Sequence, residues 1–276
     1  MKIVFLLILL TLGFRAHADS FKTRIHSIDL AKSSSQSHLI LMENGRVVFV
    51  RFDQAELLDS FKESLRLQDM LEVEVDSKNN FLSAETVEAA KVPPVATSNI
   101  KRMSYDPTVV TSYSAVSSIF RRMRRDYQND SQCYNRAHVW AYEEFLNTGL
   151  KSSKLFLFFT RRYIRNYRYK WWFHVSPMAL VKQGSSVVER VLDRRYTGGP
   201  RYVSTWTRNF VHSGRKCPVV YKYYDYRNNQ ESEDCYLIPV SMYFWQPRDI
   251  ERRDRTGAEK TQFFNREINH AYWEAF

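Results

Sequence analysis

In the first third of the chain, apolar residues are spaced as in β-strands in some segments and as in an α-helix in another. Two apolar-rich runs flank Asn44-Gly45, a dipeptide favoured in two-residue hairpin turns, and predict a β-hairpin. Residues 54–67 have apolar positions at helical spacing, whereas residues 70–76 alternate like a half-buried strand. These patterns predict a small β-rich domain over residues 19–88, either barrel-like or built on an open sheet. It contains no cysteine and no cluster of His, Asp and Glu, so we expect no chemistry there.

The pattern is then interrupted. Residues 89–104 include two tandem prolines and have no sustained period, which is typical of a linker. A larger domain is predicted over residues 105–276. It opens with a helix over 114–127 that has an apolar stripe on one side and four arginines on the other. A charged helix face is more often solvated surface than a nucleic-acid site, and we expect no nucleic-acid partner.

A second helix is predicted from Asp130 or Ser131, as the N-cap, to about Asn147, with Gly149 as its C-terminal stop. Cys133 falls in its first turn, where free backbone N–H groups and the helix dipole stabilise a thiolate. A nucleophilic thiol needs a base and a group that orients the base. The alternative for Cys133 is a buried, inert cysteine.

Two candidates for these roles follow downstream. Residues 155–160 form a buried apolar run, and strands at about 171–181 and 187–193 make a second hairpin. With Gln183-Gly184 as a two-residue turn, His174 lies directly opposite Asp193, with Cβ atoms about 5 Å apart. A carboxylate in that place would fix the tautomer and orientation of an imidazole. A hydrogen-bonded strand histidine and a surface aspartate paired with the next arginine are the structural alternatives.

The N-terminus predicts export. A lysine at position 2 precedes a short apolar run and small residues at 16–18, a pattern typical of a signal peptide cleaved after Ala18. An N-terminal membrane anchor is the alternative, and no later segment is apolar and long enough to span a bilayer. Cleavage removes Lys2 and Arg15, which lowers the formal charge from +11 to +9. We expect a secreted or periplasmic protein.

The segment between Cys217 and Cys235 has a polar tip and is predicted to be hairpin-like. A disulfide between the two cysteines is expected in an oxidising compartment. No pattern with ligand spacing surrounds them, so no metal site is expected. Residues 200–210 predict a helix with Pro200 at its first position. The C-terminal residues 261–276 predict another helix with aromatic residues in the core.

Several motifs in combination resemble the protein-glutaminase (protein-glutamine deamidase) family over roughly residues 107–196. They are "CYNRAH" from Cys133, "GLKSSKLFLF" from Gly149, "WWFHVSP" from Trp171 and "VLD" ending at Asp193. The resemblance implies an α+β fold with a transglutaminase- or papain-like core, in which the nucleophile helix packs on an antiparallel sheet. It implies Cys133 as nucleophile, His174 as general base and acid, and Asp193 as the orienting carboxylate.

The implied reaction is hydrolysis of the side-chain amide of protein-bound glutamine, with protein or peptide substrates and no cofactor. A transglutaminase or a cysteine peptidase would use the same triad. A third hypothesis is a non-catalytic protein that binds anionic surfaces. Residues 19–88 would be either an inhibitory pro-segment or a permanent accessory domain. The sequence does not define the oligomeric state, the natural substrate, or whether water or an amine accepts the acyl group.

Overall fold

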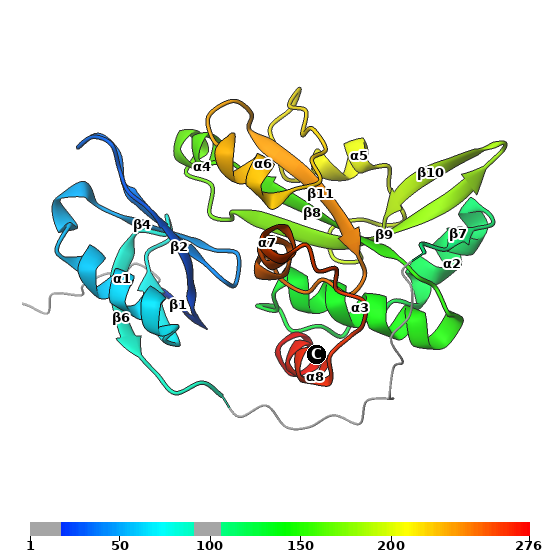
Figure 1. Ribbon diagram of the computed structural model, residues 1–276, viewed down its shortest axis with the longest axis horizontal. Helices are drawn as coiled ribbons and strands as arrows, with labels where there is room; N and C mark the ends of the chain where they lie inside the picture. Colours follow the sequence, from blue (N-terminus) through cyan, green and yellow to red (C-terminus); the bar gives the residue numbers. More distant parts are fainter. Residues whose placement is uncertain (1–17, 91–105) are drawn as a thin grey trace, which may run out of the picture. The chain divides into compact units, whose positions relative to one another are not determined.

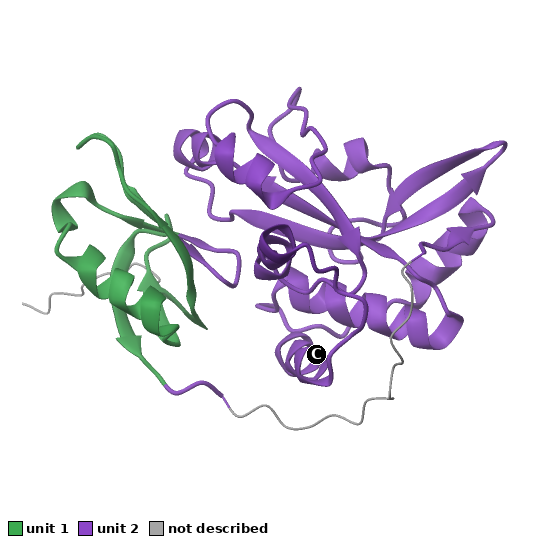
Figure 2. Ribbon diagram, viewed as in Figure 1, with its two compact units in different colours: residues 1–40, 48–87 green, residues 41–47, 88–276 purple. Residues whose placement is uncertain are grey.

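The computed structural model describes residues 18–90 and 106–276. Figure 2 shows the two compact units into which they divide. The first unit comprises the residues up to Ile40 together with Val48–Val87, and the second comprises Leu41–Val47 and Glu88–Phe276. The apolar run of the expected signal peptide and most of the expected linker lie outside the described residues.

The first unit is β-rich and carries one α-helix. Its elements are β1 (Asp19–Thr23), β2 (Ile25–Asp29), β3 (His38–Met42), β4 (Val47–Val50), the 3-10 helix η1 (Phe52–Gln54), α1 (Leu57–Leu67), β5 (Leu71–Val75) and β6 (Phe81–Thr86). They form two three-stranded sheets, ordered β1-β5-β6 and β2-β3-β4. The hairpin, helix and strand predicted from the sequence are confirmed as β3–β4, α1 and β5. Gly45 in the hairpin turn has a φ of +91°, a conformation that favours glycine.

The second unit is built on a mixed sheet surrounded by helices (Figure 1). Its elements are β7 (Val109–Val110), α2 (Tyr113–Arg122), α3 (Cys133–Thr148), β8 (Ser153–Phe159), α4 (Arg161–Tyr167), β9 (Phe173–Gln183), β10 (Ser186–Val191), α5 (Val203–Thr207), α6 (Tyr223–Asn228), β11 (Cys235–Ser241), α7 (Pro247–Thr256) and α8 (Asn265–Ala275). The sheet has the order β10-β9-β8-β11, and β7 pairs with β9 in parallel. The α+β class predicted from the sequence is confirmed.

The core of this unit lies between the sheet and α3. Strand β8 lies between β9 and β11 in the sheet and is buried along almost its whole length. Trp140 of α3 packs in one apolar cluster with Ala179 and Val181 of β9 and with residues of α2. Another cluster joins α3, through Ala141 and Tyr142, to α8 and the segment after β11. The helix is therefore held from two sides.

The register of the β9–β10 hairpin differs from the prediction. Ser186 pairs with Gln183 and Val191 with Met178, so the turn consists of Gly184 and Ser185 and not of Gln183 and Gly184. Gly184 has a φ of +62°, and glycine at the first central position is what a type II′ hairpin turn requires. The pairing is displaced by two residues, which leaves every side chain on the face where it was expected.

Two further local predictions were wrong. The segment enclosed by the two downstream cysteines is not a hairpin, because it contains the helix α6 before β11 begins at Cys235. The helix expected to start at Pro200 is the shorter α5, which begins at Val203. Pro200 instead precedes Arg201, which makes an isolated bridge with Val191 at the end of β10.

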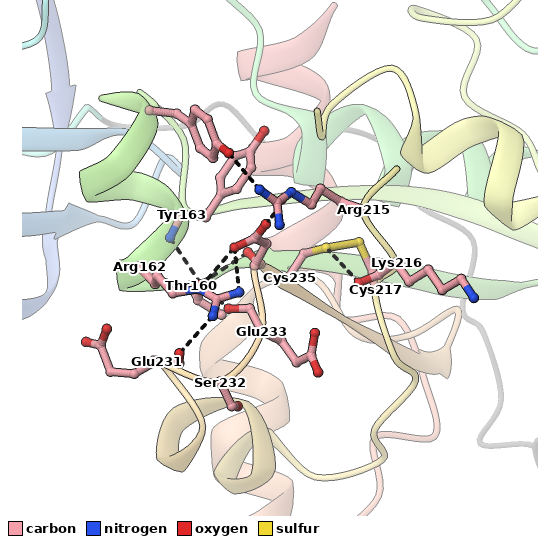
Figure 3. A network of polar contacts seen from close by, with 12 residues as sticks. Thr160, Arg162, Tyr163, Arg215, Lys216, Cys217, Glu231, Ser232, Glu233 and Cys235 are labelled. Carbon is pink, nitrogen blue, oxygen red and sulfur yellow. Dashed lines mark hydrogen bonds and ion pairs between the residues drawn. A yellow bond between two sulfur atoms is a disulfide. The ribbon is translucent and has the colours of Figure 1, made fainter. Parts of the chain in front are cut away.

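The disulfide is confirmed: Cys217 and Cys235 are bonded. Figure 3 shows the polar contacts around it. Asp234, next to Cys235, is buried and pairs with Arg162 at 2.8 Å and with Arg215 at 3.0 Å. The hydroxyl of Thr160 donates to the carbonyl of Glu233 at 2.7 Å. The disulfide and these contacts together join the long loop before α6 to the end of β8. A disulfide is consistent with an oxidising compartment.

The hairpin tip Leu41–Val47 is attached to the sheet of the second unit. The amide N–H of Trp172 donates to the carbonyl of Gly45, and its indole N–H donates to the carbonyl of Met42. A Cβ atom added at Gly45 would meet the ring of Phe173 at 3.3 Å. This close approach and the positive φ both require glycine in the tip. No helix among residues 18–90 and 106–276 is long and apolar enough to cross a membrane.

Loss of the disulfide should lower the stability of the second unit. The cysteines are 18 residues apart, and a loop of that size gives about 3 kcal/mol in the loop-entropy model. For a domain of this size, that corresponds to a fall in melting temperature of roughly 6–12 °C. Thermal unfolding of the Cys217→Ser/Cys235→Ser variant would measure it, with the reductant-treated variant as a control. An unchanged melting temperature would contradict the expectation.

Candidate active site

Cys133 is the first residue of α3. The residue before it, Gln132, is the N-cap, so the caps expected at Asp130 or Ser131 were wrong by one or two positions. The side chain of Gln132 makes no capping hydrogen bond to the first turn. The helix therefore presents N–H groups without a side-chain cap beside the sulfur, and an anion placed there gains from the helix dipole, typically by about 0.3–1 kcal/mol.

His174 and Asp193 form a buried pair. The imidazole Nε2 lies 2.7 Å from Oδ2 of Asp193, and both side chains are almost inaccessible to solvent. His174 is the second residue of β9, and Asp193 follows the end of β10 by two residues. Asp193 is not paired opposite His174 in the ladder, because the ladder ends at Val191. The contact forms because the shifted register keeps both side chains on one face and the chain turns after Val191.

Trp206 of α5 completes the environment of the carboxylate. Its indole N–H donates to Oδ2 of Asp193 at 2.8 Å, so one carboxylate oxygen accepts from both the indole and the imidazole. The ring of Phe210 lies 4.3 Å from that of His174, and the half-exposed ring of Tyr196 meets it edge-on at 5.2 Å. These aromatic side chains restrict the imidazole while leaving Tyr196 at the protein surface.

The electrostatics of the pair favour its charged form. Burial lowers the pKa of His174, but the charge of Asp193 and hydrogen bonds with Asp193 and Cys133 outweigh it and raise the pKa to about 9. Burial raises the pKa of Asp193, but attraction to His174 and hydrogen bonds from His174 and Trp206 keep it below the ordinary value. At neutral pH the pair is therefore imidazolium and carboxylate.

Cys133 lies close to this pair. Its side chain is among the groups that raise the pKa of His174, after the larger effects of burial and of Asp193. Because Nε2 of His174 faces Asp193, the other ring nitrogen, Nδ1, is the one left for the sulfur. All three residues predicted from the sequence are thus brought together, in the order thiol, imidazole and carboxylate, from α3, β9 and the turn after β10.

Arg136 places a buried positive charge beside this group. It lies one turn after Cys133 on α3, and its guanidinium donates to the carbonyl and the hydroxyl of Ser131. Burial lowers the pKa of Arg136, whereas the charges of Cys133 and Asp193 oppose that effect. In the sequence, the position of Arg136 three residues after Cys133 does not distinguish a contact that supports the fold from this electrostatic one.

The opposite side of α3 rests on a second polar cluster. The side-chain nitrogen Nζ of Lys154 on β8 lies 2.6 Å from Nδ1 of His138 and 2.6 Å from the carbonyl oxygen of Phe244. Burial lowers the pKa of both Lys154 and His138 well below their ordinary values. Because His138 faces this cluster, it is not part of the group around Cys133.

The sequence did not predict the contact of Trp206 with Asp193. A tryptophan on a short amphipathic segment looks like an ordinary core residue, and it is indeed fully buried. The signal that could have pointed to it is chemical: a buried indole is a donor only and needs an acceptor. Within the described residues, no group of three or more His, Cys, Asp and Glu is arranged to hold a metal ion.

Comparisons with known proteins point to one family. Residues 107–210 match a family model described as glutaminase, and this segment contains Cys133, His174 and Asp193. The match confirms the resemblance to the protein-glutaminase family. No curated protein matches the chain.

Solved structures give the fold. A mutant of pro-protein-glutaminase superposes with a TM-score of 0.50 and 13% identity, covering 83% of this chain and 85% of that one. Pro-protein-glutaminase itself gives 0.49 and 12%, covering 83% and 84%. Protein-glutaminase from Chryseobacterium proteolyticum gives 0.38 and 14%, covering 60% of this chain and 86% of that one. At the 13% identity of the first match, the likeness is one of fold.

The His174–Asp193 pair should contribute stability that depends on pH. Its histidine pKa is raised from an unfolded value near 6.5 to about 9, so the contribution is complete below pH 6.5 and disappears as pH rises through 9. Its size is on the order of 3 kcal/mol. The measurement is chemical unfolding of the wild type and of His174→Gln between pH 6 and about 10. A stability difference that stayed constant over this range would refute the assignment.

Proposed function

We propose that this chain is an exported protein-glutamine deamidase, which hydrolyses the side-chain amide of glutamine in proteins to glutamate and ammonia. The proposal is carried by the buried, hydrogen-bonded pair of His174 and Asp193 with Cys133 beside it, all within the segment that matches the glutaminase model. A thiol at a helix N-terminus, an imidazole and a buried carboxylate form the arrangement that activates a nucleophile for acyl transfer.

In the first half-reaction, the thiolate of Cys133 attacks the carboxamide carbon of glutamine and forms a carbon–sulfur bond. The carbonyl oxygen becomes an oxyanion next to the first turn of α3, where backbone N–H groups, including that of Cys133, can donate to it. The imidazolium of His174 then gives its proton to the departing nitrogen. Ammonia leaves and a thioester remains on Cys133.

In the second half-reaction, neutral His174 removes a proton from water, which attacks the thioester carbon. The carbon–sulfur bond breaks, the thiolate of Cys133 is restored beside the imidazolium that His174 has become, and glutamate is released after its new carboxyl group gives its proton to solvent. Asp193 remains ionised throughout, because its role is to hold the ring orientation and to stabilise the imidazolium. Trp206 holds the carboxylate through its indole N–H, and Arg136 adds positive charge near the sulfur.

The alternative enzymes differ from a deamidase in the group that attacks the thioester or in the amide that the thiol attacks. A transglutaminase would admit a lysine amine in place of water, and a cysteine peptidase would admit a backbone amide in place of a glutamine side chain. A non-catalytic protein that binds anionic surfaces would not need Cys133. The family match to glutaminase favours hydrolysis of a glutamine amide. Export is supported by the disulfide and by the N-terminal sequence pattern.

Turnover should depend entirely on Cys133. With a glutamine-rich, unfolded protein as substrate, the chain lacking residues 1–18 should release ammonia and convert glutamine to glutamate. Cys133→Ala should reduce the rate by at least about 10³-fold, because removal of a triad nucleophile leaves only weak residual catalysis. An ammonia assay and mass spectrometry of the substrate protein, with and without a primary amine, would measure it.

The Cys217→Ser/Cys235→Ser variant is the matched control, since it removes the other two sulfurs and retains Cys133. Below its melting temperature it should retain turnover. Incorporation of the amine in place of water would move the assignment to a transglutaminase. Absence of ammonia, both from the chain and from a version lacking residues 19–100, would overturn the deamidase proposal.

We also propose that residues 19–88 are a removable pro-segment that restrains activity, with a permanent accessory domain as the alternative. The likeness to a mutant of pro-protein-glutaminase covers 83% of this chain and therefore extends beyond the second unit. The hydrogen bonds of the tip Leu41–Val47 to Lys170 and Trp172 within the second unit are a further reason to test the segment.

Cleavage within residues 89–104 should therefore raise activity. A specific protease site introduced there should increase kcat/KM roughly tenfold or more on cleavage, which corresponds to a restrained state favoured by about 1.4 kcal/mol or more. The same protease acting on a chain without the introduced site is the control. Equal activity before and after cleavage would favour the permanent domain.

A further inference from the structure

The turn that carries Asp193 also carries an unneutralised positive surface. Asp193 is followed by Arg194, Arg195 and Tyr196, and the amides of Tyr196 and Thr197 both donate to the carbonyl of Asp193. Half-exposed Tyr196 packs edge-on against His174. The turn therefore reaches from the buried carboxylate to the protein surface within a few residues.

Arg195 is fixed next to the nucleophile helix. Its guanidinium donates to the carbonyls of Gln128 and Asn129, in the loop before α3, and lies 5.3 Å from the ring centre of Tyr127 and 5.9 Å from that of Tyr196. Its charge also lowers the pKa of Arg136, after the larger effect of burial. Arg195 is thus close enough to Arg136 to affect its pKa, and Arg136 in turn interacts with Cys133 and Asp193.

Arg194 is held in a similar way on the other side of the turn. Its guanidinium lies 4.7 Å from the ring centre of Phe120 and donates to the carbonyls of Met123 and Arg121 at the end of α2. Burial lowers the pKa of Arg194, and the nearby charge of Arg125 lowers it further. Two like charges are therefore kept close together, a repulsion that an anionic ligand between them would relieve.

We call Arg121, Arg125, Arg194 and Arg195 the basic rim. Within the described residues, none of the four makes an ion pair with a carboxylate. By contrast, their neighbours Arg122 and Arg124 are neutralised, by Glu144 and by Asp126 and Glu143. Asp130, in the loop before α3, forms no ion pair with the rim. Backbone carbonyls orient the guanidinium groups without cancelling their charge, and each of these groups retains N–H donors for an incoming carboxylate.

We propose that the basic rim binds acidic segments of the substrate, so that the enzyme prefers glutamines with Asp or Glu within a few residues. The inference rests on the deamidase function proposed above. The occupant is a polypeptide because the rim shares a turn with Asp193, the carboxylate of the proposed site, and the substrate proposed for that site is a protein. Charge complementarity of this kind alters specificity and association more than it alters total affinity.

The test uses peptides of equal length with one central glutamine and flanking residues that are either glutamate, serine or lysine. At about 0.01 M salt, where the screening length is about 30 Å, kcat/KM should be roughly three- to tenfold higher for the glutamate peptide than for the serine peptide, and lower still for the lysine peptide. At about 1 M salt the screening length is about 3 Å and the preference should largely disappear.

The preference should be lost when the rim is neutralised. In Arg194→Gln/Arg195→Gln, the ratio of kcat/KM for the glutamate and serine peptides should approach one. Arg125→Glu, a change at an exposed side chain with no hydrogen bond or ion pair in the described structure, should reduce the ratio without disturbing the fold. The matched control Arg252→Gln/Arg255→Gln removes two exposed charges from α7, which carries no site residue, and should keep the preference.

Measurements of peptide binding test the preference for acidic segments independently of the proposed deamidation. With Cys133→Ala, fluorescence anisotropy should give a tighter Kd for the glutamate peptide, and the rim variant should abolish that difference even if no peptide is deamidated. Equal kcat/KM and equal Kd for the three peptides at low salt would overturn the inference while leaving deamidation intact. It would also be overturned if the rim variant lost binding to single-stranded DNA or anionic vesicles but kept the peptide preference.

Discussion

The buried ion pair of His174 and Asp193 is the interaction on which the rest of the site depends. Two charges removed from water are favourable only if each finds partners that compensate for lost solvation. Here the imidazole has the carboxylate and the thiol, and the carboxylate has the imidazole, the Trp206 indole and the field of Arg136. The thiol and Arg136 come from α3 and the indole from α5, so the pair is satisfied only when β9, the turn after β10, α3 and α5 are all in place.

The position of α3 follows from the same requirement. One side of the helix places Cys133 and Arg136 next to the pair. Another side places His138 against the fully buried side chain of Lys154. Apolar packing of Trp140 on β9, and of Ala141 and Tyr142 toward α8, fixes the helix between these polar groups. Hydrophobic contacts are not directional, whereas the polar contacts at Arg136 and His138 are, so the latter define the rotation of the helix about its axis.

Much of this could be predicted from local patterns. The periodicities of α1, α3, β8 and β9 lie within each segment, and the order of Cys133, His174 and Asp193 can be read along the chain. The hairpin register could not, because Gly184 can occupy either central position of a two-residue turn. The error did not remove the predicted contact, since a displacement of two residues preserves the faces of a strand. Trp206 and Arg136 act through contacts across the fold, which no local pattern encodes.

The three cysteines also constrain how the chain must fold in an oxidising compartment. Three sulfurs permit three different disulfides, and only the bond between Cys217 and Cys235 leaves Cys133 free. Cys133 is itself almost fully buried at the start of α3, beside His174, which limits the approach of another sulfur. If α3 packs on the sheet before the disulfide forms, this burial keeps Cys133 out of the wrong pairings. The packing that positions Cys133 for the proposed reaction thus also disfavours a disulfide between Cys133 and either of the other two cysteines.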